Sequence, residues 1–212
     1  MARPRLHALD DLLDVAEQLV TSGDTAGLTL RTLAARAGVS NGSIYHAFRS
    51  KEELLARLWL RASDRLGEIM TEALPEDTDG ADGPTCVVAA ALSPVSLARR
   101  HPISAQLFFA QRSDQLFSAD VAPEVVEHLD KQQRQFTSLL IELAKAVWGR
   151  KDRAAVEAVA VCVVDIPGGL LRRTLMAGGT PDAAAETRIE AAVRAILALP
   201  LAPSTEKTRQ DQ

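Results

Sequence analysis

The sequence predicts an all-α protein in two parts: a small N-terminal domain at residues 1–52 and a larger helical domain at 53–199. A disordered tail is expected at 200–212. The composition supports this, because Ala, Leu, Glu and Arg are abundant while aromatic residues make up only 4% of the chain, which favours helices over a β-sandwich. Apolar residues recur at three- and four-residue steps along most of the chain. Capping and turn-forming residues separate these apolar patterns.

Two helices are expected at the start of the chain. Residues 6–23 carry Leu, Ala and Val at helical spacing, and Gly23 is a suitable stop. Thr29 is expected to cap the second helix, because a threonine side chain can accept a hydrogen bond from the first turn. Gly38 is expected to end that helix in the left-handed conformation, which glycine adopts without a steric penalty.

The third helix begins almost at once after the second. Ser40 is its expected cap, and Ile44 and Phe48 are expected to point inward. Ser50 then opens a longer helix over 51–74 through a capping box, since Glu follows it at the third position.

Beyond this helix the chain alternates between a loop and further helices. Residues 75–84 are acidic and rich in turn formers, which predicts a loop. The helices expected after it cover residues 85–100, 103–112, 123–149, 151–179 and 182–199. Pro167 is expected to kink or interrupt the fourth of these, because proline lacks the N–H that a helix interior needs.

The cysteines and the apolar runs bound the cellular context. Cys86 and Cys162 lie far apart within apolar patterns, so buried reduced thiols are expected, with a disulfide or metal pair as the alternative. The longest apolar run, residues 158–164, is shorter than the ~18 residues that a membrane span requires. The N-terminus turns acidic too early for a signal peptide. We therefore expect a soluble, cytoplasmic protein without a membrane partner.

Two short helices joined by a tight turn have the outline of a helix-turn-helix. With Ile44 and Phe48 packed inward, the start of the third helix presents small polar and ring side chains to the outside. In a helix-turn-helix protein this end of the second helix enters the major groove of DNA, where such groups meet base edges. The residues expected on this surface are Ser40, Asn41, Gly42, Ser43, Tyr45 and His46. For His46, an exposed side chain without a DNA role is the alternative.

The charge distribution supports contact with phosphate. The formal net charge is −4, yet residues 28–51 carry four basic residues and no acidic one. Lys51 occupies the first turn of a helix, where it opposes the helix dipole, so local stability does not explain it. A phosphate bound there would be held by the Lys and by the exposed N–H groups. The hydroxyls of Thr29 and Tyr45 are further phosphate candidates, and Arg31 adds positive charge.

Other functional classes receive little support. The four histidines lie in separate segments, and no metalloprotease, nucleophile-elbow or phosphate-loop motif occurs. We therefore expect no enzymatic activity, no metal and no cofactor. Arg3 and Arg5 form either an arm that enters the minor groove or an uninvolved N-terminus.

The stretch TLRTLAARAGVSNGSIYHAFRSKEELL, residues 29–55, resembles the DNA-binding signature of the TetR (tetracycline-repressor-like) family of bacterial regulators. The matching features are T-L-R-x-L-A-x-x-A-G-V-S, G-S-I-Y, Phe48 and S-K-E-E-L-L. The sequence departs from the family at Asn41, where Lys is frequent, and at Ala47, where His or Tyr is frequent. Affinity is therefore expected to depend more on Tyr45, His46, Lys51 and Arg31.

The resemblance implies a repressor that binds a palindromic double-stranded DNA operator as a homodimer and responds to a small-molecule effector. It also implies a four-helix dimer interface formed by the last two helices, and an effector cavity in the larger domain. The apolar residues that agree with such an interface are Val156, Val159, Val163, Ile189, Val193 and Ile196.

The effector cavity is the least determined part of the prediction. The candidate lining residues are Phe108, Phe109, Arg112, Trp148 and Asp165. Aromatic residues at helical spacing are commonly core residues, so a place in the core is the alternative for Phe108, Phe109 and Trp148. Asp165 interrupts an apolar helix, so it is either buried with a polar partner or exposed at the kink. A helical ligand-binding protein without a DNA-reading function is the alternative for the whole chain.

Overall fold

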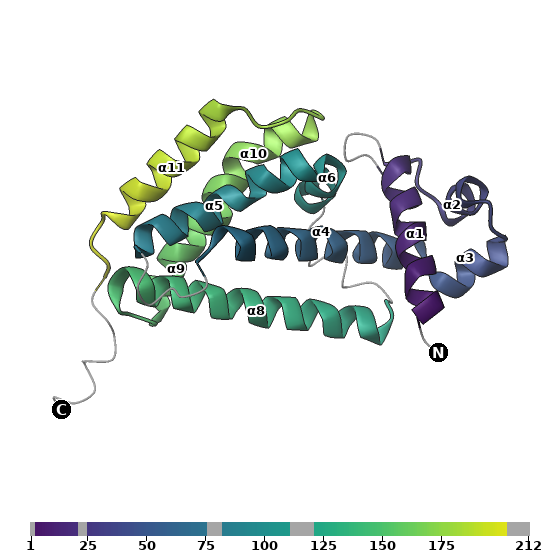
Figure 1. Ribbon diagram of the computed structural model, residues 1–212, viewed down its shortest axis with the longest axis horizontal. Coiled ribbons are helices and arrows are strands. Elements are labelled where there is room, and N and C mark those ends of the chain that lie inside the picture. Colours follow the sequence, from purple (N-terminus) through teal and green to yellow (C-terminus); the bar gives the residue numbers. More distant parts are fainter. Residues whose placement is uncertain (1–2, 21–24, 76–81, 111–120, 203–212) are drawn as a thin grey trace.

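The computed structural model describes residues 3–20, 25–75, 82–110 and 121–202, with only the backbone described for residues 3–8. In these ranges the chain is helical and forms no strand, so the predicted all-α class is confirmed. The head, at one end of the molecule, consists of three helices (Figure 1). They are α1 (Arg3–Leu19), α2 (Leu30–Ala37) and α3 (Asn41–Ala47).

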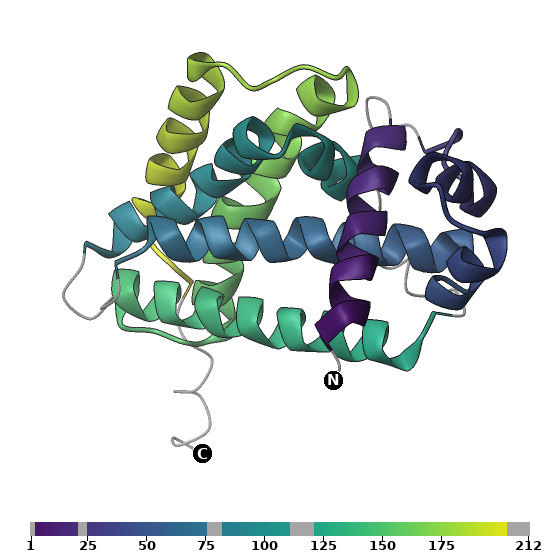
Figure 2. The same ribbon diagram turned by 45° about the vertical axis from the view of Figure 1, so that its right-hand side comes forward.

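The remaining helices form the body. They are α4 (Lys51–Ala73), α5 (Gly83–Arg100), α6 (Pro102–Ala110), α8 (Pro123–Trp148), α9 (Arg153–Ala160), the π-helical segment η1 (Val161–Asp165), α10 (Ile166–Met176) and α11 (Ala183–Leu197). α4 runs from the head through the body, with α8 alongside it (Figure 1). α5 is the central helix, because α4, α6, α8, η1, α10 and α11 all pack against it. Figure 2 shows α1 crossing α4 at a steep angle.

The head is built around a small apolar cluster that its caps hold in register. Leu33 of α2, Ile44 of α3 and Phe48 are fully buried, as predicted. Gly38 ends α2 in the left-handed conformation, with a φ of 69°. Each of these features depends on residues a few positions away, which is why the sequence pattern predicts them correctly.

The cap of α4 forms only in part. The N–H of Glu53 donates to the Ser50 hydroxyl at 3.1 Å, as a capping box requires. The carboxylate of Glu53, however, accepts from the Arg57 guanidinium at 2.8 Å and 3.0 Å, and does not reach back to close the box. The ion pair with Arg57 takes its place because the two residues lie one turn apart on α4.

The head and the body share α4. The predicted boundary at residue 52 falls within the first turn of this helix. The apolar cluster of the head continues through Leu54 and Leu58 of α4, and it includes Leu107 of α6. The head is therefore packed on the body through two helices that belong to the larger domain.

Several predicted element boundaries shift. α1 begins at Arg3, so Arg3 and Arg5 belong to a helix, while the predicted stop at Gly23 lies outside the described residues. α5 begins at Gly83, inside the predicted loop. A Cβ at Gly83 would collide with the backbone carbonyl of Ala146 in α8, so only glycine allows this close approach.

The start of the predicted tail packs on the body. Leu201 lies against the main apolar cluster, and the Arg150 guanidinium donates to the Ala202 carbonyl at 2.9 Å. Residues 203–212 of the predicted tail lie outside the described residues.

The predicted interruption of the long penultimate helix takes the form of a π-helical segment. Pro167 has no N–H, and its ring would collide with the carbonyl four residues earlier in a regular α-helix. In η1 the N–H of Ile166 donates to the Val161 carbonyl, five residues back. This wider turn accommodates the proline and rotates the helix before α10 begins.

The apolar residues predicted for a dimer interface have mostly another role. Val159, Val163, Ile189 and Val193 are buried inside this chain, in the cluster around α5. Their assignment to an intermolecular surface is therefore wrong. The same helices leave other apolar side chains exposed, namely Val161 at 36%, Val164 at 46% and Leu170 at 40%.

The helical stretch Arg153–Met176 is long and apolar enough, by length and composition alone, to cross a membrane, and 33% of its most apolar part is buried in this chain. Uninterrupted apolar runs alone predict no segment long enough to span a membrane. By helix length and overall apolar composition that prediction is wrong. A core helix of a water-soluble protein meets the same criterion, and this stretch packs on α5.

Both cysteines are free and buried, as predicted. Burial raises the pKa of the Cys162 thiol from 9.0 to about 11, and burial followed by the charge of Asp82 raises the pKa of Cys86. Because the thiolate is the reactive form, we expect a thiol-specific reagent at pH 8 to react slowly with the native protein and rapidly with both cysteines in denaturant. Fast reaction of a native thiol would contradict this burial.

The raised pKa of the Cys162 thiol also predicts that the free energy of unfolding falls as the pH rises from 9 toward 11, because the thiol ionises in the unfolded chain before it ionises in the native protein.

Candidate nucleic-acid interface

The outer face of α3 is polar and accessible. α3 packs on α2 after a turn in which the Val39 N–H donates to the Ala34 carbonyl at 3.1 Å. Asn41, Gly42, Ser43, Tyr45 and His46 are all exposed, and Tyr45 is 60% exposed despite its size. Tyr45 therefore presents both an apolar ring and a hydroxyl group to a binding partner.

Two of the predicted contact residues have a structural role as caps. The Ser40 hydroxyl accepts from the N–H of Ser43 at 3.1 Å and lies 2.9 Å from the Ser43 hydroxyl. The Thr29 hydroxyl accepts from the N–H of Thr32 at 3.0 Å, and the Thr32 hydroxyl accepts from the N–H of Thr29 at 2.9 Å. Thr32 was not predicted, although the three-residue spacing of the two threonines is a capping-box signal.

The remaining side chains of α3 are available for a ligand. In the part of the chain that the structure describes, Asn41, Tyr45 and His46 make no side-chain hydrogen bond. Their donors and acceptors therefore face solvent without an internal partner to displace.

Lys51 has an internal partner that the sequence does not reveal. Its Nζ donates to the carbonyl of Thr25 at 2.7 Å, and its side chain is partly buried. The bond joins the start of α4 to the loop between α1 and α2. Lys51 therefore has a structural role in a contact between distant segments, in addition to its predicted role in phosphate binding. To bind a phosphate, the Lys51 ammonium group must either contact it while keeping the hydrogen bond to the Thr25 carbonyl or give up that bond.

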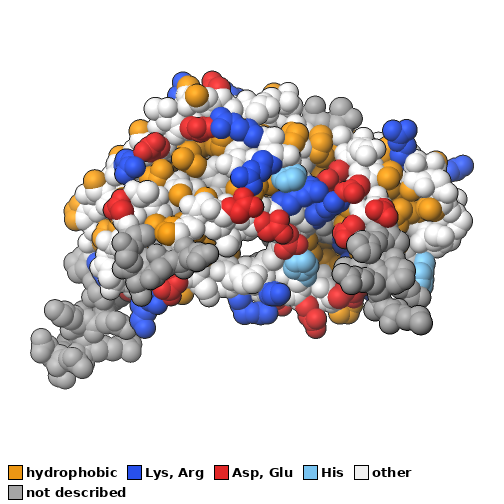
Figure 3. Space-filling view, viewed as in Figure 1, with side chains coloured by type: hydrophobic (Ala, Val, Ile, Leu, Met, Phe, Trp, Pro, Cys, Tyr) orange, Lys and Arg blue, Asp and Glu red, His pale blue; other side chains and the backbone are white. Residues whose placement is uncertain are grey.

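Basic side chains surround α3 on the head. Arg31 and Arg36 on α2 are exposed, and so is Arg49, which follows α3 directly. Figure 3 shows basic side chains at the outer end of the head. Arg49 was missing from the predicted contact set, although it is one of the four basic residues between 28 and 51. Arg49 lies between α3 and α4, two residues before Lys51.

Of the predicted cavity residues that the structure describes, Phe108 and Phe109 are in contact with each other, whereas Trp148 and Asp165 lie on other helices. Phe108 stacks on Trp59 of α4 with ring centroids 5.1 Å apart, and Phe109 meets Phe108 edge-on at 5.5 Å. Trp148 lies at the end of α8 and packs against the main apolar cluster. Asp165 is exposed, so its assignment to a pocket is wrong. Arg112 lies outside the described residues.

The fold and this surface define the class of protein: an all-helical body that carries a helix-turn-helix head. Residues 12–58 match the sequence model of the family described as "Bacterial regulatory proteins, tetR family". The match covers most of the head and the first part of α4. Its predicted helix-turn-helix signature, at residues 29–55, lies within the matched segment.

Relatives of known sequence match over about a third of the chain. An HTH-type transcriptional regulator of Mycobacterium tuberculosis is 39% identical over 72 residues, which are 34% of this chain and 36% of the relative. The HTH-type transcriptional regulator AcrR of Shigella flexneri is 33% identical over 61 residues, which are 29% of this chain and 28% of the relative. The matched stretch thus spans about a third of the length of these relatives.

Solved structures match over nearly the whole chain. A bacterial regulatory protein in the tetR family from Rhodococcus RHA1 superposes with a TM-score of 0.63 at 17% identity, covering 90% of this chain and 95% of its own. A TetR-family transcriptional regulator from Streptomyces coelicolor superposes with a TM-score of 0.61 at 21% identity, covering 89% and 96%. At these identities the likeness shows a common fold.

Proposed function

We propose that this chain is a homodimeric transcriptional repressor of the cytoplasm that binds a palindromic DNA operator and releases it in response to a small-molecule effector. The observation that carries the proposal is the exposed polar face of α3, on which the side chains of Asn41, Tyr45 and His46 make no hydrogen bond within the described residues. This face lies in the segment that matches the family. Asn41 and His46 are the proposed base contacts, with Ser40, Gly42 and Ser43 beside them at the start of α3. Tyr45 and Lys51 are the proposed phosphate contacts, together with Thr29 and Arg31.

The dimer proposal is supported by the apolar surface of η1 and α10. Val161 and Val164 lie three residues apart and face solvent, and Leu170 continues the exposed surface on α10. A patch of exposed large apolar side chains on one helix is typical of an interface between subunits. Pairing these helices about a twofold axis would place two heads on one DNA molecule, as a palindromic operator requires.

The effector proposal is supported by the aromatic contacts between α4 and α6. Trp59 and Phe108 join these helices by stacking, and Phe109 extends the cluster toward the main core. A ligand that inserts between these rings would move α6, which also contacts the head through Leu107. Trp148 and Asp165 have no part in this proposal.

The proposed function is tested by selecting bound fragments from random DNA with the purified full-length protein at two salt concentrations. The expected result is an enriched palindrome with two half-sites, bound more tightly at low salt. Weak, salt-sensitive binding without an enriched sequence would favour the alternative of a helical ligand-binding protein that does not read DNA.

Replacing Lys51 by methionine separates its two roles. If Lys51 contacts phosphate, affinity should fall equally for operator and random DNA, and the slope of log affinity against log salt should decrease by about one. Loss of the bond to Thr25 alone should instead lower thermal stability and leave the salt slope unchanged. Lys131→Met is a matched control, because it removes one exposed positive charge from α8, outside the head. Equal salt slopes for the wild type and Lys51→Met would exclude the phosphate contact.

A further inference from the structure

Three arginines on α4 tie this helix to its neighbours. Arg57, Arg61 and Arg65 follow one another at intervals of one turn, so they lie along one face of the helix. Arg57 pairs with Glu124 of α8 at 3.0 Å. The next two arginines both pair with carboxylates of the head helix α1, Arg61 with Asp14 and Arg65 with Glu17. In the space-filling view, acidic and basic side chains alternate where α1 meets α4 (Figure 3).

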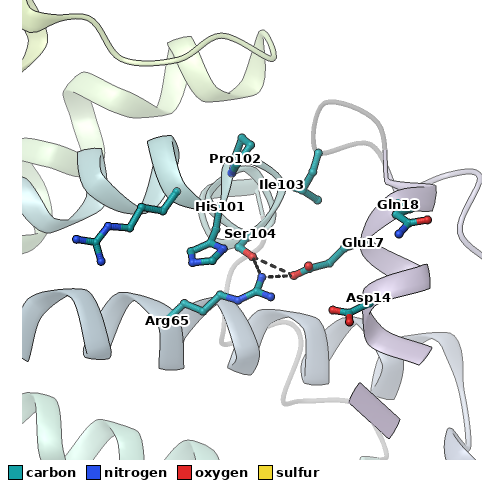
Figure 4. Close-up of a pocket in the computed structure, with 9 residues that line it drawn as sticks. Asp14, Glu17, Gln18, Arg65, His101, Pro102, Ile103 and Ser104 are labelled. Carbon is teal, nitrogen blue, oxygen red and sulfur yellow. Dashed lines mark hydrogen bonds and ion pairs between the residues drawn. The ribbon is translucent and has the colours of Figure 1, made fainter. Parts of the chain in front are cut away.

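Glu17 is the point where three helices meet. Its Oε1 accepts from Arg65 Nη1 of α4 at 2.7 Å and from Ser104 Oγ of α6 at 2.9 Å. Arg65 Nη1 also contacts Ser104 Oγ, which closes a triangle of polar contacts (Figure 4). Ser104 is only 1% exposed, and the Glu17 and Arg65 side chains are 14% and 19% exposed. These contacts are therefore largely shielded from water. In such a shielded environment, charged hydrogen bonds are stronger than at an open surface.

The triangle borders a cleft of about 370 Å³ at the junction of the head and the body. Asp14, His101 and Pro102 also line it (Figure 4). Burial, and after it the nearby charge of Arg65, lowers the pKa of His101 below its ordinary value. The imidazole is therefore neutral at pH 7, and Arg65 remains the positive partner of Glu17.

The polar triangle restricts the orientation of the head on the body, which the apolar contacts between them do not. Ile103 and Leu107 of α6 pack against the head cluster, but apolar packing is non-directional and permits small rotations of one surface over another. The hydrogen bonds of Glu17 have fixed partners on α4 and α6 and lose strength when their geometry changes. Because α1 packs on α2 and α2 packs on α3, a change in the orientation of α1 on α4 would also shift α3.

We propose that Glu17 is a positioning residue which, through Arg65 and Ser104, fixes the orientation of the head on the body and thereby sets the spacing at which a dimer reads its two half-sites. This inference rests on the proposed function, since it requires a dimer that binds a two-part operator.

The test uses the full-length protein and the operator found by selection, in versions with base pairs added or removed between the half-sites. The variants are Glu17→Gln and Ser104→Ala. Asp11→Asn is the matched control, because Asp11 is an exposed acidic residue of the same helix and loses the same charge. The wild type should prefer one spacing. Glu17→Gln should reduce that preference by about two- to thirtyfold and keep the base preference within each half-site, whereas Asp11→Asn should behave as the wild type does.

A purely structural role for Glu17 would weaken binding at every spacing by the same factor, and an unchanged spacing profile would overturn the proposal. Equal flattening by Asp11→Asn would overturn it too, because loss of charge alone would then suffice. If Glu17→Gln does not fold, as judged by its thermal unfolding, the spacing preference of Ser104→Ala is measured in its place. This variant keeps the ion pair between Arg65 and Glu17. Absence of sequence-specific binding by the wild type at any spacing would instead refute the proposed function, and this inference with it.

Discussion

Replacement of Phe48 by alanine is expected to lower the free energy of unfolding of the head by about 3–5 kcal/mol. Phe48 is fully buried and is the largest such side chain in the chain's described part. It ends α3 and packs in the cluster formed by α1, α2, α3 and the start of α4. Its removal leaves a cavity that the surrounding helices fill only in part. Because whole domains have a stability of about 5–15 kcal/mol, the head should unfold separately from the body.

Thermal unfolding followed by circular dichroism should show this as an early transition that is absent from the wild type. Tyr45→Ala is the matched control, since it removes an aromatic ring from the exposed face of the same helix. Its free energy of unfolding should change by less than about 0.5 kcal/mol, while its affinity for the operator falls. A single unchanged transition in Phe48→Ala would show that the body alone holds the head in its fold.

Replacement of Val164 by glutamate is expected to dissociate the proposed dimer. Val164 is 46% exposed in the single chain and lies on η1, between Val161 and Leu170 in the sequence. A carboxylate buried there without a partner costs several kcal/mol per subunit, so the dissociation constant should rise by more than about a hundredfold. Operator affinity should fall as well, because each monomer then binds only one half-site.

Sedimentation velocity over a range of protein concentrations measures this effect. Val126→Glu is the matched control, since Val126 is a valine of α8 with a similar exposed fraction, 38%, outside the proposed interface. The control should leave the association state unchanged. A Val164→Glu variant that associates like the wild type would place the dimer interface elsewhere.

Local signals in the sequence are sufficient to predict the helix-turn-helix and its caps. The capping role of Thr29, the left-handed Gly38 and the inward positions of Ile44 and Phe48 depend on neighbours within one or two helical turns. Such signals are local, and the structure confirms each of them. The outward set on α3 follows from the same periodicity, because a short helix with one buried face has only one other face to present.

The tertiary structure alone decided which surfaces meet. Periodicity showed that the last helices are apolar, but it could not show whether α5 or a second subunit covers a given face, and Val163 and Val193 proved to belong to the core. The partners of Lys51 and Glu17 lie 26 and 48 or more residues away in the sequence, and Gly83 is needed only because α8 passes close to it. Local pattern determines where a helix begins, ends and turns its apolar face. Contacts between distant segments depend on how the helices pack, and no pattern within one helix records that.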